Sequence, residues 1–328
     1  MPLSEKSLIA RVRRMADSGR SSGQSAIVAG IGDDCAVLRF SRAHGQSFDA
    51  LVTTDFSLEG VHFRRDWHSP ESIGHRCLAR GLSDIAAMGG EPVAAFLSLA
   101  VPRDLPQVWI DRFFRGLIAL GKRHGVTLSG GDTAQSPNRI LADIIVIGKV
   151  PRREAVLRSG ARPGDCVYVS GNLGGSAAAA QEMMKKPKRK LSPKYYPRHF
   201  FPDPQIELGQ ILRRRKLASA MIDTSDGLST DLAHICEESG VGAEIDAESI
   251  PLASIGKLPR DVDLELALHG GEDYELLFTA PPNKTIPSRL AGVPITLIGH
   301  VTRKKKLFLN RDGVGQQLEP QGWEHFRR

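Results

Sequence analysis

The stretch SPESIGHRCLARGLSDIAAMGGEPVAAFLSLAVP, residues 69–102, carries a helix start, a helix end and a strand in direct succession. Ser69 and Pro70 suit a helix start, because the serine hydroxyl accepts a free backbone N–H and proline has none to satisfy. The glycine pair at 89–90 predicts the end of that helix. The apolar run 94–101 then predicts a strand.

The same alternation continues on both sides of this stretch. The pattern predicts further helices and strands at 5–18, 37–40, 50–54, 104–125, 126–133 and 140–150. Asp104 and Gly125 mark the start and the end of the second of these helices. Strands that alternate with amphipathic helices are typical of an α/β or α+β fold.

The length of 328 residues is enough for about two domains. The segment RSGARPGD, residues 158–165, resembles a joint between two halves, and we expect domains at 1–150 and 151–328. Hydrophobic residues make up 41% and charged residues 25%, as in ordinary globular proteins. The sequence has no apolar run near the ~20 residues of a membrane span and no signal-peptide core at its start. Its four cysteines form no CxxC pair, so we expect a cytoplasmic protein without a zinc site.

The net charge of +7 is concentrated in three basic runs, at 185–190, 213–216 and 303–306. Nucleic-acid binding is one interpretation of such runs. No aromatic residues alternate with these lysines, as a platform for stacked bases requires. We therefore favour solvated surface and consider nucleic acid an unlikely partner.

One apparent phosphate-binding motif is rejected. GLIALGK, residues 116–122, fits GxxxxGK, but Arg123 replaces the serine or threonine that would bind magnesium. The motif also lies within a predicted amphipathic helix rather than in a loop between a strand and a helix.

Aspartates recur beside small or hydroxyl residues at the ends of predicted elements. These are Asp33, Asp34, Asp55, Asp84, Asp132, Asp223 and Asp226. Each has an ordinary explanation alone: Asp84 could pair with Arg80, Asp226 could cap a helix, and Asp132 could serve a turn. Together they would repel one another unless cations lay between them, and magnesium prefers such oxygens. Several ions imply a nucleoside triphosphate substrate, with a second phosphate nearby.

The adjacent pair in GIGDDCAVL, residues 30–38, belongs to a predicted strand. Side chains of a strand alternate between its faces, so Asp33 and Asp34 need not serve the same ion. The hydroxyls of Thr53, Thr54 and Ser225 could add neutral oxygen ligands. His62 is either a packed structural histidine or a phosphate contact.

Eight motifs follow one another in a familiar order: GIGDDCAVL, TTDFSLEGVHF, LSDIAAMGGEP, SGGDT, RSGARPGD, IDTSDGLSTDLAHI, GGEDYELLFT and GWEHF. With them the sequence resembles the thiamine-monophosphate kinases over nearly its whole length. The aspartate pair, GGDT and SDGL recur in the wider superfamily of aminoimidazole ribonucleotide synthetase, HypE and selenophosphate synthetase. The resemblance implies a two-domain fold like that synthetase. Its N-terminal α/β domain would form a β-barrel shared in a homodimer, and an α+β domain would follow.

The resemblance also implies the substrates and their contacts. ATP and thiamine monophosphate would meet in a cleft and yield thiamine diphosphate and ADP. By motif position, the magnesium ligands would be Asp34, Thr53, Thr54, Asp55, Asp84, Asp132, Asp223 and Asp226. The ATP contacts would be Gly131, Asp132, Arg158 and Ser225, and the thiamine-phosphate contacts would be His62, Glu272 and Trp323. By the same criterion Asp34 is the direct ligand and Asp33 a supporting residue.

Two features depart from the family pattern. Gly81, preceded by Arg80, stands where asparagine is usual, so Arg80 could approach a carboxylate or a phosphate instead. The segment 185–204 is unusually basic. Alternatives to the kinase are another ATP-dependent synthetase or activating enzyme of the superfamily, or a metal- or nucleic-acid-binding protein without ATP turnover.

Overall fold

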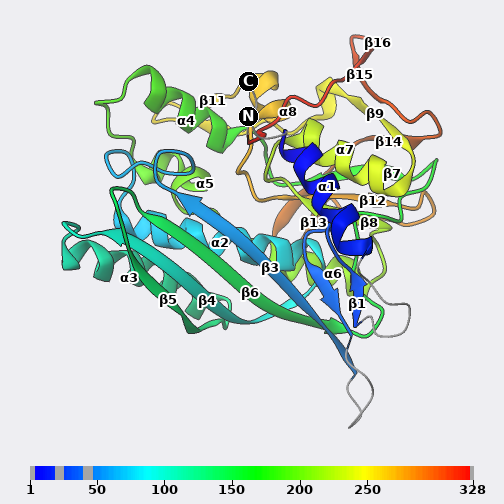
Figure 1. The fold of residues 1–328 in the computed structure, drawn as a ribbon. Helices are drawn as coiled ribbons and strands as arrows, with labels where there is room; N and C mark the ends of the chain where they lie inside the picture. The colour runs from blue at the N-terminus through cyan, green and yellow to red at the C-terminus, as the bar shows by residue number, and fades with distance from the viewer. Residues whose placement is uncertain (1–3, 19–25, 40–46, 326–328) are drawn as a thin grey trace.

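Two β-sheets, one in each half of the chain, organise the molecule (Figure 1). The structure is a computed structural model that describes residues 4–18, 26–39 and 47–325. Among the helices of these residues, no helix is both long and apolar enough to cross a membrane.

The N-terminal sheet has six strands in the order β1-β2-β3-β6-β4-β5. Only β4 and β5 are parallel neighbours. The strands are β1 (Ile27–Ala29), β2 (Ala36–Leu38), β3 (Phe48–Leu58), β4 (Glu91–Pro102), β5 (Thr127–Ser136) and β6 (Leu141–Pro151). The helices of this half are α1 (Glu5–Ser18), α2 (Pro70–Ala87) and α3 (Gln107–Arg123).

The C-terminal sheet runs β16-β15-β9-β14-β7-β12-β8, with β13 added to β14. Its strands are β7 (Cys166–Ser170), β8 (Ala220–Asp223), β9 (Gly242–Asp246), β12 (Leu276–Ala280), β13 (Arg289–Leu290), β14 (Val293–Thr302), β15 (Leu307–Arg311) and β16 (Val314–Gln317). A separate hairpin pairs β10 (Ser254–Ile255) with β11 (Arg260–Asp261). The helices are α4 (Gly175–Lys185), η1 (Pro193–Tyr195), α5 (Pro197–Phe200), α6 (Ile206–Arg214), α7 (Leu228–Ser239), η2 (Ala247–Ser249) and α8 (Leu264–His269).

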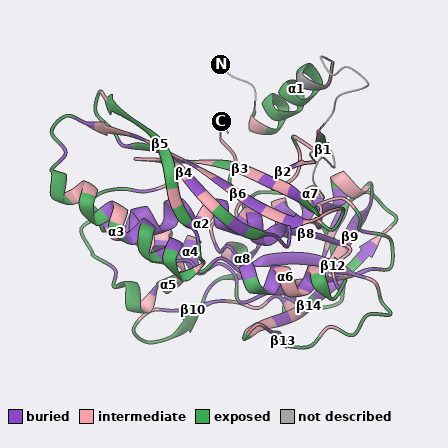
Figure 2. Cartoon of the chain, turned by 90° about the horizontal axis from the view of Figure 1, so that it is seen from below, coloured by how far each residue is buried: buried purple, intermediate pink, exposed green. Residues whose placement is uncertain are grey.

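Helix α2 is the centre of the molecule. It is buried over most of its circumference, because it packs against the N-terminal sheet on one side and against α6 and β8 on the other. Figure 2 shows buried residues concentrated between the sheets. One apolar cluster therefore spans both halves and includes Leu82 of α2, Ile144 of β6 and Phe278 of β12.

Glycines let α2 and α3 approach closely. A Cβ at Gly74 would lie 2.0 Å from the carbonyl oxygen of Phe113, and a Cβ at Gly116 would lie 1.9 Å from that of Glu71. No side chain fits at such distances, so the crossing of the two helices depends on these glycines.

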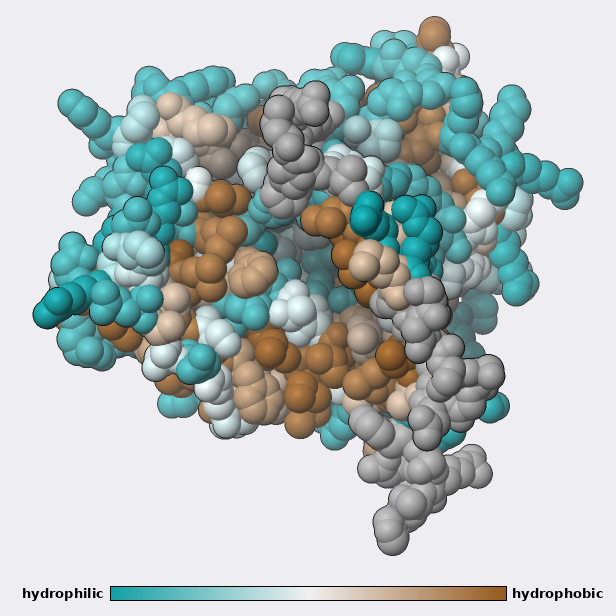
Figure 3. Space-filling view, in the orientation of Figure 1, coloured by the Kyte–Doolittle hydropathy of each residue, from teal (hydrophilic) through white to brown (hydrophobic). Residues whose placement is uncertain are grey.

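The face of the N-terminal sheet opposite α2 is partly apolar, and no helix or strand of residues 4–18, 26–39 and 47–325 covers its exposed apolar side chains. Phe48 and Phe56 are 48% and 54% exposed, and Val93 and Leu141 are also exposed. Apolar residues gather over β3 and β6 in the space-filling view (Figure 3). We call this surface the open face.

Most predicted elements are confirmed, with shifts at their ends. Ser69 caps α2 by accepting the backbone N–H of Ser72 at 3.2 Å. The predicted start at Asp104 is wrong, because α3 begins at Gln107 after Pro106. GLIALGK lies inside α3, as expected. The end of the strand predicted at 37–40 falls outside the described residues.

The structure decides between the explanations offered for several aspartates. Asp33 forms an isolated β-bridge and Asp34 lies in a bend, so neither belongs to the predicted strand, which begins after them as β2. Asp132 lies in β5, within the strand predicted at 126–133, and its alternative explanation as a turn residue is wrong, because the strand continues through both glycines. Asp226 does not cap α7, whose cap is Gly227, with the Asp231 carboxylate accepting the Gly227 N–H at 3.0 Å.

Candidate active site

Three carboxylates from distant parts of the chain meet between the two halves. Asp34 comes from the bend before β2, Asp84 from α2, and Asp223 from the end of β8. Each offers an oxygen within 4.8 Å of the other two. The side chain of Asp34 is fully buried, and Asp223 is 2% exposed. We call these three residues the carboxylate cluster.

Neighbouring hydroxyls orient the cluster. Thr53 of β3 donates a hydrogen bond to Asp84 Oδ2. Ser83 of α2 donates to Asp223 Oδ2 at 2.6 Å. Asp55, two residues after Thr53 and hence on the same face of β3, has a buried Oδ2 without a hydrogen-bond partner. A buried carboxylate oxygen without a donor is suited to a cation.

Burial and mutual repulsion disfavour the ionised form of these acids. Burial, then the Asp34 charge, raises the pKa of Asp223 to about 7. Burial and the charges of Asp55 and Asp223 raise the pKa of Asp84 well above its usual value. The pKa of Asp55 is raised as well, mainly by burial. A bound cation would remove the repulsion, and the all-oxygen donor set fits magnesium better than softer metals.

Arg158 holds both members of the adjacent aspartate pair. Its guanidinium binds Asp34 through two hydrogen bonds, of 3.0 and 3.2 Å. Its backbone N–H donates to the Asp33 carboxylate at 3.2 Å. Burial, then the charge of Asp34, raises the pKa of Asp33 to about 7. The two aspartates therefore have different roles. Asp34 points into the cluster, whereas Asp33 accepts the backbone N–H of Arg158.

Two predicted ligands lie on the opposite side of the N-terminal sheet. The hydroxyl of Thr54 donates to Asp143 at 2.7 Å. Asp143 pairs in register with Ser98, and Ser98 with Asp132, so their side chains share one face. That face is the open face, and Asp132 is exposed there. The preceding Gly131 is exposed and has a φ of +146°, and a Cβ there would lie 1.8 Å from the carbonyl oxygen of Leu97 on the neighbouring strand β4.

A second group of polar residues adjoins the cluster. Glu272 forms ion pairs with Arg76 at 2.7 Å and Arg80 at 2.5 Å, both from α2. Although burial raises the pKa of Glu272, these guanidinium groups hold it well below its usual range. The sequence suggested either a carboxylate or a phosphate as the partner of Arg80, and the structure pairs it with a carboxylate. The expected pairing of Arg80 with Asp84 is not the one the structure records.

Aromatic rings extend this second group. The rings of His62 and His325 meet edge to face at 5.4 Å, and those of His325 and Trp323 at 5.8 Å. Trp323 is 53% exposed. Burial, then the positive charge of Arg80, lowers the pKa of His62 to about 3, so the ring is neutral at physiological pH. The structure thus brings His62 and Trp323 together through His325.

The turn at Ser225 and Asp226 joins the parts of the site. The Ser225 carbonyl accepts the Glu272 N–H at 2.8 Å, and the Asp226 carbonyl accepts the Trp323 N–H at 2.9 Å. Burial, then the charge of Glu5, raises the pKa of Asp226 to about 6. Glu5 of α1 in turn accepts the His325 N–H at 2.7 Å.

Sequence reasoning missed several residues of the site: Arg76, Ser83, Asp143, Asp231 and His325. Arg76 lies one helical turn before Arg80, so helix geometry could have suggested it. Ser83 has no such local signal, because adjacent side chains of a helix do not face each other and its partner is the distant Asp223. Asp143 has no local signal, because its contact with Thr54 depends on strand register.

Comparison with known proteins adds to this geometry. The family model for the N-terminal domain of AIR synthase related proteins matches residues 32–150, and the model for the C-terminal domain matches 162–312. The thiamine-monophosphate kinase of Escherichia coli K12 is 38% identical over 99% of each chain. That of Bacillus subtilis is 36% identical over 94% of this chain and 96% of the relative.

Solved structures agree with the sequence comparisons. AaThiL complexed with AMPPCP and TMP superposes with a TM-score of 0.82 at 34% identity, over 99% of each chain. Thiamine-monophosphate kinase from Stenotrophomonas maltophilia gives 0.71 at 33% identity, over 94% of this chain and 96% of that one. HypE of E. coli shares the fold, with a TM-score of 0.69 at 18% identity.

Proposed function

The chain belongs to the thiamine-monophosphate kinase family, and on that premise we propose that it transfers the γ-phosphoryl group of ATP directly to thiamine monophosphate. The products are thiamine diphosphate and ADP. The observation that carries the proposal is the meeting of Asp34, Asp84 and Asp223 within 4.8 Å in a chain with full-length similarity to these kinases.

The carboxylate cluster, with Asp55, is the proposed binding place of several magnesium ions. Magnesium supplies the positive charge that offsets repulsion between two anionic phosphates and holds them in line. Two unit charges 4 Å apart repel by about 4 kcal/mol at an effective dielectric constant of 20. The hydroxyls of Thr53 and Ser83 fix the carboxylate oxygens that face this charge.

The acceptor needs no general base from the protein. A phosphate monoester has a second pKa of about 6, so thiamine monophosphate is mostly a dianion at neutral pH. The protein has to position two anions rather than remove a proton. We assign Arg158, Gly131, Asp132 and Ser225 to ATP, and the side chain of Arg158 is 21% exposed.

We assign the acceptor to the group around His62, Glu272 and Trp323. The half-exposed Trp323 ring offers an aromatic surface for the rings of thiamine. Neutral His62 can donate or accept a hydrogen bond without adding charge. Glu272, fixed by Arg76 and Arg80, keeps a carboxylate at the edge of the site.

A second copy of the chain is the proposed partner of the open face. Exposed Phe56 and Leu141 would be buried by a twofold-related sheet, which would close the barrel that one chain leaves open. Thr54 and Asp132 would then lie in the interface, where their roles in the site depend on the second subunit.

We place the domain boundary at residue 150 and the protein in the cytoplasm.

The test is incubation of the purified chain with ATP, magnesium and thiamine monophosphate, followed by chromatography. The proposal predicts thiamine diphosphate and ADP in equal amounts. ATP turnover that requires a different acceptor would instead favour another synthetase of the superfamily. A phosphorylated side chain trapped by acid quenching would rule out direct transfer.

A further inference from the structure

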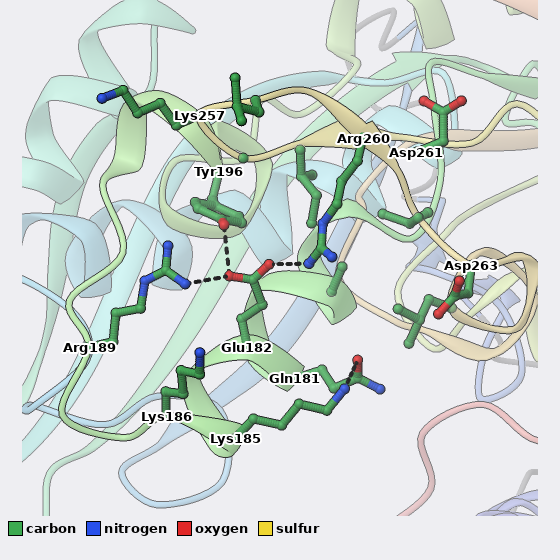
Figure 4. Close-up of a pocket in the computed structure, with 16 residues that line it drawn as sticks. Gln181, Glu182, Lys185, Lys186, Arg189, Tyr196, Lys257, Arg260, Asp261 and Asp263 are labelled. Atoms are coloured by element: carbon green, nitrogen blue, oxygen red, sulfur yellow. Dashed lines mark hydrogen bonds and ion pairs between the residues drawn. The ribbon is translucent and has the colours of Figure 1, made fainter.

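A pocket of about 630 Å³ lies in the C-terminal half, outside the candidate active site. Helix α4, the basic segment that follows it, and the β10–β11 hairpin form its walls (Figure 4). None of the residues assigned above to magnesium, ATP or thiamine monophosphate lines it. Its volume falls within the range of about 300–1,000 Å³ that is typical of small-molecule sites.

The floor of this pocket is apolar. Tyr196, Ile255 and Val262 line it and belong to a buried apolar cluster of the C-terminal half. Leu258, at the hairpin turn, also lines the pocket and is 85% exposed. An exposed leucine beside an apolar floor is a surface that a ligand with an apolar body would cover.

Glu182 organises the charged wall. Its side chain, 16% exposed, accepts hydrogen bonds from the Tyr196 hydroxyl at 2.8 Å and from Arg260 at 2.6 Å. It also pairs with Arg189 at 3.7 Å. The two guanidinium groups are thereby held over the pocket while remaining more than half exposed, which leaves donors on both for a ligand.

Two further cations, Lys186 and Lys257, line the pocket. Within the part of the chain that the structure describes, no hydrogen bond or ion pair is recorded for the ammonium groups of Lys186 and Lys257. Figure 4 shows both on the same side of the pocket as Arg189, with Asp261 and Asp263 on the other side. The basic segment is therefore not only a convex solvated face, because part of it forms one wall of a concave site.

We propose that this pocket binds a phosphorylated small molecule. Its phosphate groups face Lys186, Arg189 and Lys257, and its apolar body covers Leu258 and the floor. Phosphate suits this wall, because its several oxygens accept hydrogen bonds from cations that approach from different directions. Binding here needs no metal ion, whereas the carboxylate cluster repels anions until cations occupy it. The proposal is therefore independent of the proposed kinase activity.

The test is calorimetric titration of the full chain with ADP in EDTA at low ionic strength. EDTA removes the metal that anion binding at the carboxylate cluster requires, so the heat reports the pocket. We expect one ADP per chain, bound more tightly than inorganic pyrophosphate because the nucleoside covers the floor. The double variant Lys186→Glu/Lys257→Glu weakens ADP binding at least tenfold.

The matched control is Lys304→Glu/Lys305→Glu, which makes the same change of charge in an exposed basic run outside the pocket. It leaves ADP affinity within about twofold of the unmodified chain. Three results would overturn the proposal: no ADP binding in EDTA, an equal loss in both double variants, or pyrophosphate binding as tight as ADP.

Discussion

At the scale of single residues, Asp84 is the carboxylate of the candidate site on which the charges of the other acids act. It lies partly buried beside three other acids, and burial and their charges raise its pKa. We predict that Asp84→Asn lowers kinase activity by roughly 100-fold or more, since it removes charge that the reaction needs. The same change raises the melting temperature in EDTA, because it removes repulsion. Steady-state kinetics and thermal unfolding measure the two effects.

Asp104→Asn is the control, because Asp104 is exposed in a turn outside the site. It should change neither activity nor stability. If Asp84→Asn loses activity because the fold is damaged, its melting temperature in EDTA falls instead of rising. That outcome would contradict the assignment of Asp84 to the cluster.

Arg158 supplies positive charge that offsets the repulsion between these carboxylates. It neutralises Asp34, whose side chain is fully buried. Removal of one partner of a buried ion pair costs about 3–5 kcal/mol, because the other charge is left without compensation. We therefore predict that Arg158→Ala destabilises the protein by about 3 kcal/mol in EDTA. Denaturant unfolding measures the loss, with the exposed Arg162→Ala as control.

A double substitution checks the origin of that loss. When Asp34→Asn is combined with Arg158→Ala, the amide replaces the charge, and most of the stability should return. Equal destabilisation with and without Asp34→Asn would show that Arg158 acts through other contacts.

At the scale of elements, the crossing of α2 and α3 places Asp84 and its neighbours. Alanine normally stabilises a helix relative to glycine by about 1 kcal/mol. We predict the reverse at Gly116, because a Cβ there lies 1.9 Å from the Glu71 carbonyl oxygen. Gly116→Ala should cost about 1–3 kcal/mol, the usual cost of overpacking. Denaturant unfolding again measures it.

The control for this prediction lies on the same helix. Ala119 is exposed on α3, so Ala119→Gly should cost only the ordinary helix propensity, about 1 kcal/mol. A gain in stability for Gly116→Ala would mean that the helices can separate freely, and the close crossing would not be a constraint.

The sequence predicts the helices and strands better than it predicts the contacts between them. Strand and helix order follows from local patterns, and the cap of α2 at Ser69 is confirmed. The sequence also singled out Asp34, Asp84 and Asp223, which the structure brings together. Strand alternation puts Thr53 and Thr54 on opposite faces, but the sequence could not show which face holds the site, because that depends on which side the helices cover. Asp132 lies in the predicted strand, and for the same reason the sequence could not show that it belongs to the open face.

At the scale of the whole molecule, cation binding and stability are coupled through pH. Burial and neighbouring carboxylates raise the pKa of Asp33 and Asp223 to about 7 from a usual value of 3.8. Without metal, the folded state therefore holds protons between about pH 4 and 7 that the unfolded state has released. Since the folded state binds more protons there, these two groups make stability fall as pH rises through that range.

Magnesium at the carboxylate cluster relieves the part of this loss that comes from Asp223, because it takes the place of the proton on that carboxylate. We predict that the rise in melting temperature caused by magnesium, relative to EDTA, is larger at pH 7.5 than at pH 5. Protonation of buried histidines such as His62 affects both conditions equally and cancels in the difference. Thermal unfolding at the two pH values measures it, and equal shifts at both would contradict magnesium binding at the carboxylate cluster.

The most direct measurement is the fate of the γ-phosphoryl group of radiolabelled ATP, incubated with the purified chain, magnesium and thiamine monophosphate. The account predicts label in thiamine diphosphate for the unmodified chain and for Asp104→Asn, and almost none for Asp84→Asn. Label that appears only in inorganic phosphate or on the protein, or full transfer by Asp84→Asn, would contradict it.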